Sequence, residues 1–382
     1  MATEKSELQV LEGNRDFTTS LYKVLAETPG NVFFSPISVH VVLSMCYQGA
    51  KGTTAEKFAS SLKVPTSAAA AEGYSVVMNR LNSIPNVLLL MANKIYLMEG
   101  YELLPEFSDA VAKNFLSEVQ LVNFAAIEAA AACINAWVEE KTKYKIKNFI
   151  KKEVLDSSTR LVLVNAIYFM GSWMNPFDKD CTKTAPFYLN MVKSVNVPMM
   201  NKYGEFNYKA DKKLDAQILE LAYTNDNLSM IIILPNKRNG IDKLEKKLAT
   251  CNFSEITENM CNTGVIIQLP KFKIEQTIFL NNPLTKLGLG EIFKPCGANF
   301  SGMIVSNEQI HVSQVIQKAF IEVNEEGTEA SAVVEARLMK FCNSLQRPPP
   351  PKKFIADHPF IYFLSEKRIN HLFAGRLSDP TN

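Results

Sequence analysis

The chain has 382 residues, a formal net charge of +2 and 21% charged residues, which is the balance of an ordinary soluble globular protein. This charge gives no electrostatic reason to expect nucleic-acid binding, and no apolar run is long enough to span a membrane. We therefore expect neither a nucleic acid nor a membrane as a partner. Helix-like and strand-like segments mingle with no Gly/Ser-rich or charged linker between them, which is compatible with one α+β domain over residues 1–382.

The seven cysteines are scattered, odd in number and without a C-x-x-C pair. This usage argues against a disulfide framework or a zinc site and fits a reducing compartment. Residues 1–7 lack the apolar core of a signal peptide. A cytoplasmic protein and a mature extracellular chain with an added Met would both begin in this way, so the compartment stays open.

In the first half of the chain, apolar residues at helical spacing predict helices over residues 8–25 and 36–48. Ser35 is placed to cap the second helix, with Pro36 at its first position, and its apolar residues on nearly all sides predict a central location. Thr53 and Glu56 have the spacing of a capping box, which predicts the start of the next helix there. Further helices are expected over residues 68–82 and 126–143.

Residues 161–169 are apolar except for Asn165, as in a central strand that is buried on both faces. The buried amide must find partners, because leaving it unpaired costs about 1–3 kcal/mol. Further strands are expected over residues 86–98, 195–200, 217–221, 229–234, 265–274, 359–364 and 371–377, with a helix over residues 241–249.

Chemistry-bearing motifs are absent from the sequence. The four histidines are far apart and match no metal-ligand spacing, and there is no G-x-S-x-G elbow or phosphate-binding loop. We therefore expect no enzyme, no metal site and no cofactor. A lysine cluster near the end of the helix at 126–143 could bind a polyanion, but a solvated face explains it more simply; its members are Lys141, Lys143, Lys145, Lys147, Lys151 and Lys152.

A period-two pattern from Thr328 to residue 338 predicts a half-buried strand with small inward side chains. The segment begins at Gly327 and ends in a run of four prolines at 348–351, which cannot continue a hydrogen-bonded ladder. Such a segment can be a strand in one state and a loop in another. An ordinary edge strand with a long exit loop is the alternative, and the residues alone leave both open.

The segment KAFIEVNEEGTEA at 318–330 resembles the hinge of the serpins. Similar motifs follow the serpin order at residues 31–38, 134–138, 161–169, 197–200, 269–272, 356–360 and 372–376. Because several long motifs occur in order over about 350 residues, the chain is identified as a member of the serpin superfamily. This resemblance implies an α+β fold with about three β-sheets, about eight or nine helices and a reactive-centre loop near residues 325–353, all in one domain.

The resemblance also implies a function. Serpins of the inhibitory type are suicide substrates of serine proteases, and their loop insertion is itself a standard example of stored strain released by a switch. The expected partner is a chymotrypsin-like or trypsin-like protease held in a covalent complex by a monomeric inhibitor, with a glycosaminoglycan as at most a weak further partner. Two alternatives stay open, namely a non-inhibitory carrier, chaperone or storage serpin and an inhibitor of papain-like cysteine proteases.

The site residues follow from the same resemblance, residue by residue. The hinge comprises Glu325, Glu326, Gly327, Thr328, Glu329, Ala330, Ser331 and Ala332. Small inward residues in this hinge favour inhibition, although the valines at 333 and 334 are bulkier than the usual alanines. The shutter beneath the opening of the insertion sheet comprises Ser35, Ser38, Asn165 and Gln317, and Gln317 stands where the family commonly has His. The breach at the top of that sheet comprises Lys271, Glu325 and Trp173.

The expected scissile bond is Phe341–Cys342, by the usual family spacing from the hinge glycine. Lys340–Phe341 is the alternative, because the loop is a few residues longer than usual on its far side and the register can shift. An aromatic residue before the cut suits a chymotrypsin-like protease, whereas a lysine suits a trypsin-like one.

Overall fold

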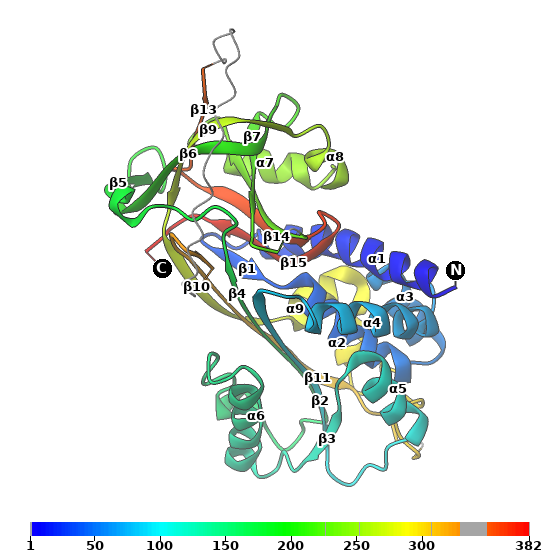
Figure 1. Ribbon diagram of the computed structural model, residues 1–382. Coiled ribbons are helices and arrows are strands. Elements are labelled where there is room, and N and C mark those ends of the chain that lie inside the picture. Colours follow the sequence, from blue (N-terminus) through cyan, green and yellow to red (C-terminus); the bar gives the residue numbers. More distant parts are fainter. Residues whose placement is uncertain (1, 226, 252, 307, 329–349, 382) are drawn as a thin grey trace.

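The computed structural model describes residues 2–225, 227–251, 253–306, 308–328 and 350–381 (Figure 1). Within these ranges there are nine α-helices: α1 Ala2–Leu25, α2 Pro36–Gly49, α3 Gly52–Leu62, α4 Ser67–Asn82, α5 Pro105–Phe115, α6 Ile127–Lys141, α7 Ile241–Leu248, α8 Phe253–Thr257 and α9 Asn281–Leu284. The strands are β1 Val32–Phe34, β2 Val87–Met98, β3 Val119–Val122, β4 Leu161–Ser172, β5 Lys183–Tyr188, β6 Ser194–Asp211, β7 Ala216–Ala222, β8 Leu228–Pro235, β9 Cys261–Pro270, β10 Phe272–Phe279, β11 Val312–Val323, β12 Gly327–Thr328, β13 Lys352–Ile355, β14 Phe360–Glu366 and β15 Asn370–Leu377.

The strands form two hydrogen-bonded sheets. One is six-stranded with the order β10-β11-β12-β4-β2-β3, and the other is nine-stranded with the order β1-β15-β14-β8-β7-β6-β9-β13 and β5 paired to β6. The 18-residue strand β6 joins two parts of the larger sheet, because it pairs with β5 at its start, with β9 along its middle and with β7 at its end. The expected sheets are thus present as two networks, and the α+β fold is confirmed.

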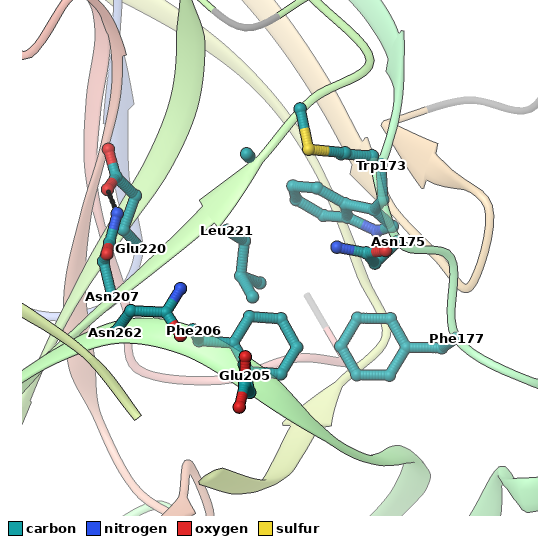
Figure 2. Close-up of a pocket in the computed structure, with 11 residues that line it drawn as sticks. Trp173, Asn175, Phe177, Glu205, Phe206, Asn207, Glu220, Leu221 and Asn262 are labelled. Carbon is teal, nitrogen blue, oxygen red and sulfur yellow. Dashed lines mark hydrogen bonds between the residues drawn. The ribbon is translucent and has the colours of Figure 1, made fainter. Parts of the chain in front are cut away.

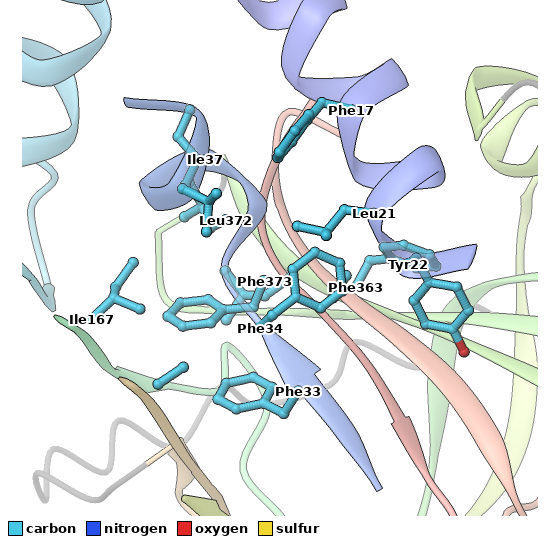
Figure 3. Close-up of a cluster of buried hydrophobic side chains, with 14 of the residues drawn as sticks. Phe17, Leu21, Tyr22, Phe33, Phe34, Ile37, Ile167, Phe363, Leu372 and Phe373 are labelled. Carbon is cyan, nitrogen blue, oxygen red and sulfur yellow. The ribbon is translucent and has the colours of Figure 1, made fainter. Parts of the chain in front are cut away.

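Helix α2 lies at the centre of the helical layer, as its apolar sequence predicts. Ser35 caps it by accepting a hydrogen bond from the Ser38 backbone N–H at 3.3 Å, and every residue of the helix except Gln48 is buried. The aromatic cluster beside it joins α1, β1 and the β14–β15 pair, with the rings of Phe33 and Phe373 stacked 5.3 Å apart (Figure 3). This cluster ties the N-terminal helices to the C-terminal strands.

Strand β4 is buried on both faces, which explains its nearly continuous apolar run. Leu163 and Ile167 face the main hydrophobic core beside α2, whereas Val164 and Tyr168 face a second cluster beneath α6. Helix α6 therefore covers the opposite face of the six-stranded sheet from the other helices, as Figure 1 shows. The six-stranded sheet is the central layer between these two clusters.

Two predictions about local structure are wrong. The strand expected over residues 265–274 is two strands in different sheets, because β9 ends at Pro270 and β10 begins at Phe272. The capping box at Thr53 does not exist, because α3 begins at Gly52 after Lys51, and the hydroxyl of Thr54 instead accepts a hydrogen bond from the Asn299 backbone N–H at 2.9 Å.

Two buried histidines make the stability of the fold depend on pH. Burial lowers the pKa of His40 to about 4, against the opposing effect of its hydrogen bond to the Leu62 carbonyl. Burial and, to a smaller extent, the charge of Arg15 lower the pKa of His371 to about 3. Both imidazoles are therefore neutral in the folded chain at pH 6.

We predict that the free energy of unfolding decreases as the pH falls below about 6.5, because the unfolded chain takes up these protons at a higher pH than the folded chain does. The slope approaches about 1.4 kcal/mol per pH unit for each histidine. Denaturant unfolding between pH 7.5 and pH 5 measures it. The His40→Gln/His371→Gln double variant should lose most of the slope, and an unchanged slope in that variant would contradict this account.

Candidate functional site

The first two described hinge residues lie in a fork between two strands of the six-stranded sheet. Strands β11 and β4 pair directly in parallel from the start of each strand up to Phe320 and Tyr168. Beyond that point the chain turns back, and β12 pairs antiparallel with both strands, with Thr328 opposite Gly171 on one side and Val323 on the other. A strand continuing from β12 would run down the seam between β11 and β4.

Gly327 and Thr328 fit this fork for different reasons. Gly327 has φ of 151°, and a Cβ at this position would lie 2.1 Å from the Gly171 carbonyl oxygen, so no other residue fits. Thr328 is fully buried, and its hydroxyl lies 2.8 Å from the hydroxyl of Tyr223. The entrance to the seam therefore accepts only small or neutral side chains.

Trp173 holds the turn that precedes this entrance. Its indole stacks on Tyr223 with the ring centroids 4.5 Å apart, and its Nε1 donates to the Asn324 carbonyl at 3.0 Å. Its backbone N–H donates to the Glu326 carbonyl at 2.9 Å. Figure 2 shows Trp173 and Phe177 on one side of a pocket of about 190 Å³, across from residues of β6 and β7. The turn of the hinge is thus fixed by backbone and side-chain contacts from the end of β4.

Glu325 is the buried ionised group of this site. Its side chain is 5% exposed, its Oε2 lies 2.8 Å from Lys271 Nζ, and its Oε1 accepts from the Thr182 hydroxyl at 2.8 Å. Burial alone would raise the pKa of Glu325, but the hydrogen bonds from Lys271, the backbone and Thr182 lower it below the ordinary value of 4.5. The stabilisation that these contacts give is therefore complete above about pH 4.5 and is lost as the pH falls through the lowered pKa.

A chain of amides crosses the seam lower in the sheet. Gln317 of β11 donates from Nε2 to Asn165 Oδ1 of β4 at 2.5 Å, and Asn165 Nδ2 donates to Asn93 Oδ1 of β2. Gln317 also clamps Ser35, accepting from its backbone N–H at 2.9 Å and donating to its carbonyl at 2.9 Å. The hydroxyl of Ser38 donates to Asn93 Oδ1 at 3.0 Å. Each of these five side chains is uncharged at any pH in the physiological range.

The structure brings together the four shutter residues and the three breach residues expected from the sequence. It also places four residues at the site that sequence reasoning missed, and these are Asn93, Thr182, Tyr223 and Asn324. Only Asn93 left a signal, since it is a lone amide in a strand-like segment, as Asn165 is. Residues Glu329, Ala330, Ser331, Ala332, Lys340, Phe341 and Cys342 lie outside the described residues.

The lysine cluster at the end of α6 is exposed at all six positions. Lys152 Nζ lies 3.0 Å from Glu128 Oε1, and Lys145 Nζ lies 5.3 Å from the centre of the Tyr168 ring. These contacts fit a solvated face, and a glycosaminoglycan partner stays a prediction. In the part of the chain that the structure describes, no three His, Cys, Asp or Glu side chains are grouped to hold a metal ion. None of the described helices is long and apolar enough to cross a membrane.

We predict that Glu325→Lys loosens the top of the six-stranded sheet and promotes polymers in which the hinge of one copy enters the fork of another. The substitution leaves Lys271 facing a second cation in a buried place, and breaking a buried pair costs about 3–5 kcal/mol. Native gels after mild heating measure the polymers. Glu326→Lys makes the same charge change at a carboxylate whose listed partner, Lys179, is 68% exposed, and it should stay largely monomeric. A Glu325→Lys protein as monomeric as the unmodified one would contradict the prediction.

Comparison with known proteins gives a consistent result over nearly the whole chain. Residues 12–380 match the family described as "Serpin (serine protease inhibitor)". The leukocyte elastase inhibitor of Xenopus laevis is 38% identical over 376 residues, which cover 95% of this chain and 97% of that protein.

Two solved structures show the same fold. Serpin48 of the insect Tenebrio molitor, described as a highly specific serpin, is 33% identical with a TM-score of 0.87 over 97% of this chain and 98% of its own. Human thyroxine-binding globulin in complex with thyroxine is 27% identical with a TM-score of 0.88 over 99% of this chain and 100% of its own. The fold is therefore shared by proteins that differ in what they bind.

Proposed function

Because this chain belongs to the serpin family, we propose that it inhibits serine proteases as a suicide substrate and is not itself an enzyme. The protease attacks the loop that follows the hinge and forms an acyl-enzyme on the residue before the scissile bond. The cleaved loop then enters the six-stranded sheet from β12 onward and carries the protease with it before the acyl-enzyme is hydrolysed. The partner is the target protease in a covalent complex, and the inhibitor acts as a monomer.

The observation that carries this proposal is the position of β12 in the fork between β11 and β4. A strand that continues from Thr328 would replace one parallel interface by two antiparallel ones. Antiparallel pairing is slightly more stable per residue than parallel pairing. About ten additional ladder hydrogen bonds, at roughly 1 kcal/mol each, would make insertion effectively irreversible. The fork therefore supplies both a direction and a driving force.

Opening the seam has a cost that this driving force exceeds. The hydrogen bond between Gln317 and Asn165 crosses the seam, so an entering strand must break it. A buried amide without a partner costs about 1–3 kcal/mol, which is small beside the gain from a new strand. The network therefore restrains the closed sheet without preventing insertion.

The comparisons support an inhibitor over a carrier, although the fold alone does not distinguish them. Thyroxine-binding globulin has the same fold, so the choice depends on the hinge and not on the architecture. The chain is 38% identical to a protein named for inhibiting an elastase and 27% identical to the carrier. Its hinge has Gly327 and Thr328 seated at the fork, with alanines at 330 and 332 to follow. A papain-like cysteine protease as the target is an outcome of the experiment below.

The direct experiment incubates the protein with chymotrypsin-, trypsin-, elastase- and cathepsin-type proteases and examines denaturing gels. A band that contains inhibitor and protease together supports the proposed mechanism and identifies the protease class. Cleavage by every protease with no such band would contradict it.

We predict that Thr328→Arg converts the inhibitor into a substrate. The arginine would have to bury an unpaired charge beside Tyr223, and this cost stalls insertion so that hydrolysis is faster than trapping. Thr328→Val is the matched control, since it keeps the shape and removes only the hydroxyl. The ratio of covalent complex to cleaved inhibitor measures the effect. It should fall at least tenfold for arginine and change little for valine, and a wild-type ratio for arginine would show that strand insertion is not the mechanism.

We predict that the protease cuts at Phe341–Cys342. Mass spectrometry of the C-terminal fragment released from the denatured complex identifies the bond. A fragment that begins at Cys342 supports the assignment and a chymotrypsin-like target. One that begins at Phe341 replaces it by the Lys340–Phe341 bond and a trypsin-like target.

A further inference from the structure

A cavity of about 300 Å³ lies at the open edge of β2, away from the hinge. Strand β3 covers this edge only from Ile95 onward, so residues 91–93 have no neighbouring strand on that side. The ends of α4 and α5 line one side of the cavity, and Trp137 and Lys141 of α6 line the other. Its volume is at the lower end of the range for sites that hold small molecules.

Two buried hydrogen-bond donors at this cavity have no partner among the described residues. Asn93 is 6% exposed, and its Oδ1 accepts from both Ser38 and Asn165, which fixes the orientation of the amide. Its Nδ2 is left without an acceptor, and so is the indole Nε1 of Trp137. Both residues line the cavity. A buried donor without an acceptor costs about 1–3 kcal/mol, so a ligand that brings acceptor atoms would recover this energy.

The charges at the cavity favour an anion. Glu118 and Lys141 are the ionisable side chains that line it. Glu118 is already paired with the buried Lys94, whose ammonium lies 4.7 Å from the centre of the Trp137 ring. Lys141 has no ion pair among the described residues, so one cation is left uncompensated. Met78, Met91 and Phe115 supply an apolar wall. An acceptor-rich anionic head on an apolar body fits these surroundings.

The α6 side of the cavity is connected to the seam through which a strand would enter. The side chain of Asn135 on α6 binds the backbone of Ile150, with both hydrogen bonds 2.9 Å long. The segment before Ile150 crosses over β11, where Lys318 Nζ donates to the Lys147 carbonyl at 2.6 Å. A strand that enters between β11 and β4 must therefore displace this segment and the helix attached to it.

We infer that this cavity binds a small apolar carboxylate, and that the bound molecule opposes strand insertion by tying α6 to the edge of β2. The second half of this inference rests on the proposed function, whereas the first half does not. A bound carboxylate stabilises the closed sheet in proportion to its occupancy, because it binds that arrangement in preference to one with α6 displaced.

Binding is tested with decanoate on the full-length protein, with decan-1-ol and decylamine as probes of the same chain length. Calorimetry gives the affinity, and the fluorescence of the two tryptophans, Trp137 and Trp173, gives a second readout. We expect saturable binding of decanoate, weaker binding of the alcohol and none of the amine.

Two variants locate the site. Trp137→Phe keeps an aromatic ring and removes only the donor, and it should weaken decanoate binding about tenfold. Lys141→Gln should weaken it several-fold, whereas Lys143→Gln, two residues further along and outside the cavity lining, should not. Equal affinity for decanoate and the alcohol, or equal losses at Lys141 and Lys143, would overturn the site.

The effect on insertion is tested with a protease that forms the covalent complex. Saturating decanoate should lower the ratio of complex to cleaved inhibitor in the unmodified protein and leave it unchanged in Trp137→Phe at the same concentration. Binding with no change in this ratio would overturn the coupling and leave the site. If no protease forms a complex even without decanoate, the proposed function fails together with the coupling, and the binding result still decides the site.

Discussion

The hydrogen bond from Gln317 to Asn165 joins the two halves of the six-stranded sheet at a place where both faces of that sheet are buried. Everything on either side depends on this seam staying closed. On one face the amides connect to Ser35 and Ser38, and therefore to the start of the central helix α2. On the other face the segment after α6 crosses from Lys318 toward Ile150. The sheet is thus held at its centre by a few polar contacts instead of by apolar packing alone, and polar contacts can be exchanged for others when a strand arrives.

The top of the seam is built differently from its middle. There the backbone is fixed by hydrogen bonds from Trp173 and Phe177 to the hinge turn, and the side chain of Glu325 is buried among its partners. Gly327 then brings the chain so close to Gly171 that no side chain fits between them. The entrance is therefore rigid and selective, whereas the seam below it is closed but separable. A rigid entrance above a separable seam is what a molecule needs if one chosen segment is to enter and others are not.

Much of this arrangement could be predicted from the sequence, and the failures have physical causes. The cap of α2, the burial of β4 on both faces and the need of Asn165 for partners follow from local patterns, because each depends on residues close in sequence. The identity of those partners does not, since Asn93 and Gln317 reach Asn165 only through strand register. The supposed capping box at Thr53 failed because Asn299, far along the chain, takes the hydroxyl of Thr54. The break at Lys271 was missed because β9 and β10 are both strand-like, and only the change of sheet separates them.

Glutamine at position 317 has a consequence for the range of conditions in which the molecule can work. A side chain that cannot gain a proton leaves the strength of the seam the same in a neutral and in a mildly acidic solution. The buried histidines of the helical layer and of β15 do respond to acid, so acidification weakens the body of the molecule while the amide network at its centre keeps its bonds. Mechanical release and thermodynamic stability are therefore set by different groups, and a change in acidity can alter the lifetime of the protein without altering the sensitivity of its trap.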